Sequence, residues 1–111
     1  MRITRHDDAR VVLLAVDGEV DLMTAPRLHT ALLAALRDGP RRVVILDLTR
    51  VSLLSSAGLN AMWEARQTAE RLDEPLRVVV DHARPVVRPL EITGLDRWFE
   101  LYHTVPDALA Q

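Results

Sequence analysis

The chain has 111 residues, of which 49% are hydrophobic and 27% are charged, and its formal net charge is −2. This length and composition predict a single folded domain over residues 1–111 and argue against disorder. The slight excess of negative charge argues against a nucleic-acid-binding protein, which usually carries a cluster of basic residues. Because the sequence contains no cysteine, disulfides, thiolate metal sites and cysteine nucleophiles are excluded.

No apolar run reaches the roughly 18 residues that a transmembrane helix requires. Residues 1–8 also lack the apolar core of a signal peptide. We therefore expect a cytoplasmic protein that does not insert directly into a membrane.

The first predicted elements are a hairpin and a helix. Residues 10–17 form a short, β-branched apolar run typical of a buried strand, and residues 3–5 can pair with it across a turn at Asp7-Asp8. A helix begins at Thr24-Ala25-Pro26, where Thr24 is a suitable cap and proline is tolerated in the first turn. Its apolar residues recur every three or four positions, and Gly39-Pro40 ends it.

The middle of the chain predicts a second strand and a long helix. Arg42 to Leu48 is an apolar strand placed centrally in the sheet. We expect Thr49 to Leu54 to connect this strand to a helix that begins at Ser56 or Ala57 and ends at Leu72.

The last third predicts shorter elements. Leu76 to Val80 forms a third apolar strand, Pro85 to Leu90 a short helix and Phe99 to Tyr102 an edge strand. A terminal helix runs over Val105 to Leu109, with Thr104 as its cap. Strands that alternate with helices indicate an α/β fold with a four- to five-stranded mixed sheet and helices mainly on one face.

The sequence offers little chemistry for a cofactor or a metal. It has no glycine-rich loop that would hold phosphates, so no cofactor is predicted. The histidines lack the short spacing of a metal-binding motif, and we expect them to be solvated or capping residues rather than ligands, so no metal is predicted. These histidines are His6, His29, His82 and His103.

Two groups of polar residues stand where strands end. Asp17, Glu19 and Asp21 follow the first apolar strand, and Asp21 lies close to a helix start, where a carboxylate is favoured by the helix dipole. Ser55 and Ser56 precede the long helix, where a serine oxygen accepts from unpaired N–H groups. Neither group has a base or nucleophile elbow beside it in the sequence, so we favour capping or partner binding over catalysis.

Asp47–Leu59 reads DLTRVSLLSSAGL, which resembles the signature D-L-S-x-V-x-F-[IM]-D-S-[ST]-G-L of the STAS domain family of bacterial anti-sigma-factor antagonists. Two further stretches resemble other motifs of this family. Gly18–Leu22 with Thr24–Pro26 resembles G-E-L-D-x-x-x-A-P, and Leu90–Asp96 with Phe99 resembles L-x-L-T-G-L-D-x-x-F. These stretches occur in the family's order and span nearly the whole chain.

The resemblance implies a small α/β domain that binds an anti-sigma factor, often a serine kinase, and thereby frees a sigma factor for transcription. In the regulated members, the kinase uses ATP to phosphorylate a serine or threonine at the start of the second helix, and the complex then breaks. The domain itself is not an enzyme in this scheme. A phosphate at that position adds about −1.5 to −2 charge, which would repel an acidic partner surface.

This sequence departs from the family pattern at the phosphate acceptor. The acceptor position is Ala57, which has no hydroxyl, and the aspartate of the motif is replaced by Ser55, whereas Ser56 is kept. Three interpretations follow, in this order of preference. The switch is absent; or phosphorylation has moved to Ser56 or Ser55; or the domain serves a different partner.

If the family geometry holds, the two helix starts meet at the carboxyl end of the sheet and form a patch that binds the partner. The patch comprises Asp21, Thr24, Ser55, Ser56, Ala57 and Gly58. An alternative function is a STAS-type accessory subunit of a membrane transporter or lipid-trafficking ATPase. A further alternative, an enzyme built on the acidic residues and serines, lacks a base, a metal set and a cofactor loop. The oligomeric state is left open.

Overall fold

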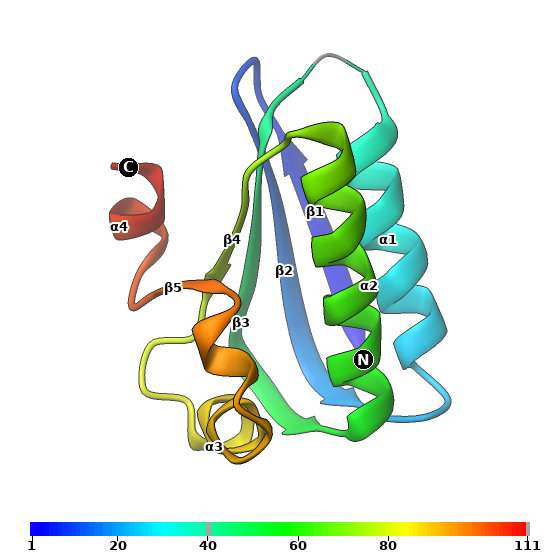
Figure 1. Cartoon of the computed structure of the whole chain (residues 1–111), viewed down its shortest axis with the longest axis vertical. Coiled ribbons are helices and arrows are strands. Elements are labelled where there is room, and N and C mark those ends of the chain that lie inside the picture. Colours follow the sequence, from blue (N-terminus) through cyan, green and yellow to red (C-terminus); the bar gives the residue numbers. More distant parts are fainter. Residues whose placement is uncertain (40, 111) are drawn as a thin grey trace.

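The computed structural model describes residues 1–39 and 41–110 and has a five-stranded sheet with strand order β1-β2-β3-β4-β5 (Figure 1). The strands are β1 (Arg2–Asp7), β2 (Val11–Val20), β3 (Val43–Leu54), β4 (Leu76–Val79) and β5 (Glu100–Tyr102). Strand β1 runs antiparallel to β2, and β2 to β5 are mutually parallel. The predicted mixed α/β sheet is therefore confirmed.

The helices lie mainly on one face of the sheet, as predicted. Helices α1 (Ala25–Arg37) and α2 (Ser56–Leu72) pack side by side there, and α3 (Arg84–Thr93) lies near the end of β3 (Figure 1). A 3-10 turn, η1 (Leu95–Arg97), follows α3, and the short α4 (Val105–Leu109) covers the opposite face. Of the predicted helix end at Gly39-Pro40, Pro40 lies outside the described residues. No helix in the described parts of the chain combines the length and the apolar character needed to cross a bilayer.

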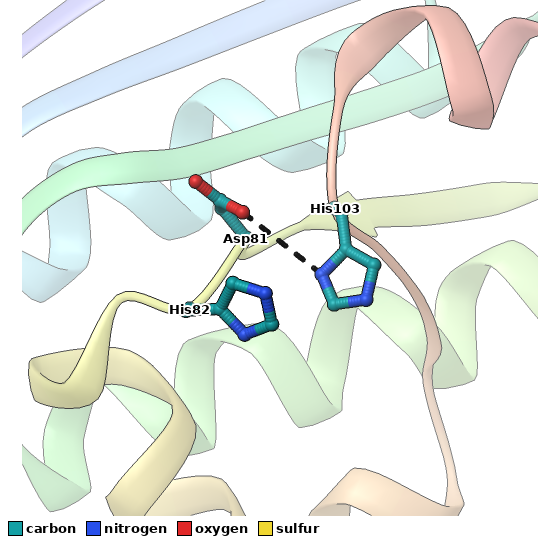
Figure 2. A group of neighbouring side chains, drawn as sticks. All are labelled: Asp81, His82 and His103. Atoms are coloured by element: carbon teal, nitrogen blue, oxygen red, sulfur yellow. Dashed lines mark ion pairs between the residues drawn. The ribbon is translucent and has the colours of Figure 1, made fainter.

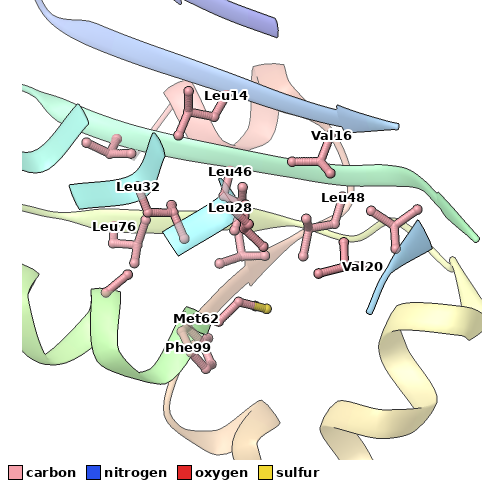
Figure 3. Packing of buried hydrophobic residues seen from close by; sticks show 14 of the residues in the cluster. Leu14, Val16, Val20, Leu28, Leu32, Leu46, Leu48, Met62, Leu76 and Phe99 are labelled. Atoms are coloured by element: carbon pink, nitrogen blue, oxygen red, sulfur yellow. The ribbon is translucent and has the colours of Figure 1, made fainter. Parts of the chain in front are cut away.

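Most of the core lies between the sheet and the pair α1 and α2 (Figure 3). Alternate residues of β2 point toward the helices, and both helices turn an apolar stripe to meet them. Each fully buried leucine or methionine contributes about 1.5–3 kcal/mol relative to exposure. The largest of these side chains include Leu14, Leu28, Leu32, Leu46, Leu48 and Met62. The opposite face has only a small cluster, formed by Ile45, Val79 and Ala108.

The segment 49–54 differs from its prediction as a connection. It continues β3 as far as Leu54, and its partner β2 also runs further than predicted, to Val20. The two-residue periodicity that would reveal this extension is interrupted, because the β2–β3 ladder shifts register between Ala15 and Asp17 and again between Gly18 and Glu19.

The parallel strands all end at one edge of the sheet, and the chain leaves this edge toward each of the four helices. We call residues 20–24 and 54–58 the β2–β3 end. We call residues 80–84 and 102–104 the β4–β5 end. Open α/β sheets place their binding sites at this edge, so both ends are candidate sites.

Candidate partner-docking site

The β2–β3 end is held together by the backbone. Val20 pairs with Leu54 in the parallel ladder, and the N–H of Ser55 donates to the carbonyl oxygen of Val20 at 2.9 Å. The loop that leaves β2 and the helix that follows β3 therefore start side by side. This arrangement brings together the residues that the sequence placed in one patch.

The loop after β2 is closed by its own hydrogen bonds. The Asp21 carboxylate accepts from the N–H groups of Met23 at 2.9 Å and Thr24 at 3.0 Å. In return, the N–H of Asp21 donates to Thr24 Oγ1 at 2.9 Å. The Thr24 hydroxyl lies 3.0 Å from the carbonyl oxygen of Glu19 and 3.1 Å from Asp21 Oδ1, and either can accept its proton.

These contacts change the role predicted for Thr24. Its side chain makes no capping hydrogen bond to α1, because the hydroxyl faces back toward the end of β2. The carboxylate of Asp21 serves the loop instead. Donation from the N–H and hydroxyl of Thr24, and then from the N–H of Met23, holds the pKa of Asp21 below its ordinary value.

The start of α2 presents one serine as a cap and the next to solvent. Ser55 is the N-cap residue, and its Oγ accepts from the N–H of Gly58 at 3.3 Å, which confirms the predicted cap. Ser56 is exposed and Ala57 is half-buried. Of the two hydroxyls, that of Ser56 is thus the accessible one.

Gly58 lies below this surface rather than on it. It is buried, and a Cβ added there would come within 2.7 Å of both Val20 Cγ1 and Leu54 Cδ1. The missing side chain therefore allows α2 to approach the ends of both strands. Any part that Gly58 plays in a patch is indirect, through the position of the helix.

The most exposed apolar side chains of this region were not in the predicted patch. Leu22 is 77% exposed and Met23 is 82% exposed, because the hydrogen bonds of the loop turn them outward. A depression of about 270 Å³ lies between α1 and α2, with Leu22 and Ala57 in its wall. Another, of about 320 Å³, lies on the far side of α2. Ser56 lines the second depression, and Asn60 lines both. We call the exposed surface of Leu22, Met23, Ser56, Ala57 and Asn60 the candidate docking face.

A pair of tryptophans borders this surface. Trp63 of α2 meets Trp98 edge to face, with ring centroids 6.0 Å apart. The guanidinium of Arg66 lies 5.4 Å from the centroid of each ring and donates to the carbonyl oxygen of Trp98. Trp63 is half-buried and Trp98 is 55% exposed. Trp63 lines the same depression as Ser56 and Asn60, so the pair borders the candidate docking face through Trp63.

The three residues of the acidic run lie in different surroundings. Asp17 and Glu19 are exposed on β2, whereas Asp21 is half-buried and engaged in the loop. Among the described residues, these three carboxylates do not belong to a group that could hold one cation.

Two of the four histidines come together, although their spacing in the sequence shows no metal-binding motif and they were expected to be solvated or capping residues (Figure 2). His82 and His103 have ring centroids 4.5 Å apart, and Asp81 Oδ1 lies 4.0 Å from His103 Nδ1. A sequence signal was available, because each histidine follows a predicted strand closely. The carboxyl ends of neighbouring parallel strands meet at one edge, which the spacing along the chain does not show.

Comparison with known proteins places this geometry in a family. The sequence profile of the STAS domain matches residues 1–108. The anti-sigma-F factor antagonist RsfB of Mycobacterium tuberculosis is 35% identical over 108 residues, which cover 96% of this chain and 85% of RsfB.

Solved structures agree with this assignment. An anti-sigma factor antagonist from Mycobacterium paratuberculosis superposes with a TM-score of 0.84 at 35% identity, covering 98% of this chain and 91% of that one. The anti-sigma factor antagonist SpoIIAA of Bacillus, in its unphosphorylated form, shares the fold with a TM-score of 0.80 at 16% identity, covering 97% and 93%. With the profile match and the relatives in agreement, the chain belongs to the STAS domain family.

Proposed function

We propose that this protein is an anti-sigma factor antagonist that binds an anti-sigma factor through the candidate docking face and so frees a sigma factor for transcription. Membership of the STAS domain family and the names of its relatives support this function. The observation that carries the proposal is the exposure of Leu22 and Met23 beside the accessible first turn of α2. The protein acts in this scheme by binding alone, without catalysis.

The physical basis is a surface that is apolar and carries little free charge. Leu22, Met23 and Ala57 present apolar atoms, and Ser56 and Asn60 are uncharged. Burying a leucine or methionine against a partner gains about 1.5–3 kcal/mol. A rigid loop loses little entropy on binding, so the hydrogen bonds around Asp21 favour the complex.

We propose that the complex is not switched by phosphorylation at position 57, because Ala57 has no hydroxyl. If a kinase acts on this helix start, Ser56 is the residue it would reach. The hydroxyl of Ser55 accepts from the helix backbone, whereas that of Ser56 is exposed. Intact-mass spectrometry after incubation with ATP and the partner tests this proposal. No added phosphate is expected; a phosphate at Ser56 would show that the switch has moved.

Binding can be measured by isothermal titration calorimetry against each anti-sigma factor encoded in the source genome. We expect Leu22→Ala and Met23→Ala each to weaken the complex about tenfold, the loss of one well-buried apolar anchor. Ala57→Asp should weaken it further, because it buries an unpaired charge.

The matched control is Gln67→Asp. Gln67 is exposed on the same helix, about 16 Å along its axis and on nearly the same side as Ser56. The Gln67→Asp substitution should leave the affinity for the anti-sigma factor unchanged. Equal affinities for the native protein, Leu22→Ala and Ala57→Asp would show that the docking face is elsewhere. Copurification with a transporter or an ATPase, and no binding to any anti-sigma factor, would overturn the function itself.

A further inference from the structure

We propose that Asp81, His82 and His103 form a binding site for a divalent transition-metal cation of the zinc class. Each residue offers one ligand atom, and these atoms all lie within 4.8 Å of one another (Figure 2). Among the described residues, this is the one group of three or more such side chains. The site lies at the β4–β5 end and is independent of the proposed docking face.

The distances between the ligand atoms are close to those in a site that holds zinc. Ligand atoms that bind one Zn²⁺ at about 2.0–2.1 Å in a tetrahedron lie about 3.3 Å from each other. Asp81 Oδ1 and His103 Nδ1 are 4.0 Å apart, and the two imidazole rings are tilted by 36°. Because all three side chains are exposed, rotation about their side-chain torsions can close this difference without moving the backbone.

The backbone holds the two contributing segments together. The N–H groups of Val80 and Asp81 both donate to the carbonyl oxygen of Tyr102, at 2.9 Å and 3.3 Å. Tyr102 immediately precedes His103, so the ligands from the two segments keep a fixed separation. Asp81 has a φ of 51°, a left-handed conformation that is uncommon for a residue other than glycine. The spacing of the ligands is thus set by the fold rather than by side-chain contact.

The chemistry of the ligands selects the class of cation. Two imidazole nitrogens with one carboxylate oxygen suit Zn²⁺, Cu²⁺ or Ni²⁺, whereas Mg²⁺ and Ca²⁺ require more oxygen ligands. Three protein ligands leave at least one coordination position for water or for a group on another molecule.

The surroundings tolerate a bound cation. The site opens into a depression of about 690 Å³, which leaves room for water ligands. The charged side chains that line it besides the ligands are two cationic and two anionic: Arg84, Arg88, Glu91 and Asp96. Their charges balance, so the surroundings add no net repulsion.

A metal at this position would join the β4–α3 connection to the β5–α4 connection. Since an ion that binds the folded chain stabilises it by mass action, zinc should raise the melting temperature. The effect should depend on both histidines, because each comes from a different connection.

The test uses the full chain without a polyhistidine tag, after dialysis against a chelator. Titration with ZnCl₂ in a calorimeter should show one saturable site, and thermal unfolding should shift upward with zinc but not with MgCl₂. Loss of a group that only orients a ligand weakens metal binding about 10–100-fold. We therefore expect His82→Ala and His103→Ala each to weaken binding by at least about tenfold, and to abolish the shift.

The control is His6→Ala, which removes an exposed histidine on β1, at a distance from the cluster. It should bind zinc as the native chain does. Circular dichroism without metal checks that every variant is folded. Absence of saturable binding, or binding that survives both cluster variants, would overturn the proposal.

Discussion

The β2–β3 end and the β4–β5 end belong to the same edge of the sheet, but they expose different kinds of side chain. At the β2–β3 end, the polar groups of Asp21 and Thr24 satisfy each other, and the side chains that face outward are apolar. At the β4–β5 end, Asp81 and His103 are exposed and share one contact of 4.0 Å. Polar side chains that are already satisfied build a rigid surface for a protein, whereas side chains that keep free lone pairs remain available for an ion.

The largest stability effect should come from the close approach at the β2–β3 end. Gly58→Val places carbon atoms where Val20 and Leu54 already lie, 2.7 Å from the Cβ position. Overpacking of this kind costs about 1–3 kcal/mol, and we expect the upper end of that range because valine adds further atoms beyond Cβ. Urea unfolding measures the change. Gln67→Val, an exposed change on the same helix, should stay within about 0.5 kcal/mol. Equal stability of the two variants would mean that α2 does not sit this close to the strands.

A smaller loss should follow when the loop of the β2–β3 end loses its hydroxyl. Thr24→Val keeps the side-chain shape but leaves the N–H of Asp21 without its acceptor. We expect a cost of about 1–2 kcal/mol by urea unfolding, because the hydrogen bond that the hydroxyl donates is lost as well as the one that it accepts. Thr4→Val, an exposed change on β1, is the control. An unchanged stability for Thr24→Val would indicate that the loop does not depend on this hydroxyl.

The pH dependence of stability should also be sensitive to this loop. Because folding lowers the pKa of Asp21, its charged form stabilises the protein above the unfolded value near 3.9, and this contribution is lost as the pH falls through the lowered pKa. The native chain should therefore exceed Asp21→Asn in stability most at about pH 5–7, and the difference should shrink toward about pH 2. Urea unfolding across this pH range measures the difference in stability between the two proteins. A difference that does not change with pH would contradict the lowered pKa of Asp21.

The smallest effects should be found at the β4–β5 end in the absence of metal. His82→Ala and His103→Ala remove exposed side chains that contact each other, with ring centroids 4.5 Å apart, and approach Asp81 only to 4.0 Å, so each should change the free energy of unfolding by less than about 0.5 kcal/mol. Guanidinium or urea unfolding in the presence of a chelator measures this. A loss above 1 kcal/mol would mean that the pair of rings stabilises the fold by itself, and that the contrast between the two ends is smaller than proposed.

Prediction from sequence was most successful where one physical signal dominated. The apolar runs of β2 and β4 and the helical spacing of α1 and α2 identified these elements, because burial on one side imposes a regular pattern. It failed at residues 49–54, where two register shifts interrupt the alternation that marks a strand. The extension of β3 follows from pairing with β2, which no local pattern expresses.

The residues of the candidate site were also predicted only in part from the sequence. The sequence placed Asp21 and Ser55 at helix starts, and the structure adds how they act: the Asp21 carboxylate closes its own loop, and Ser55 caps α2. It did not identify Leu22 and Met23, because exposure of an apolar side chain depends on how its loop folds back.

By itself, the amino-acid sequence determined the class of fold, the order of its elements and the absence of a hydroxyl at Ala57, since these depend on local composition and periodicity. Only the tertiary structure decided which polar groups are satisfied and which remain free. That outcome depends on distances between segments far apart in the chain, such as Asp81 and His103, and these distances are set by the pairing of strands.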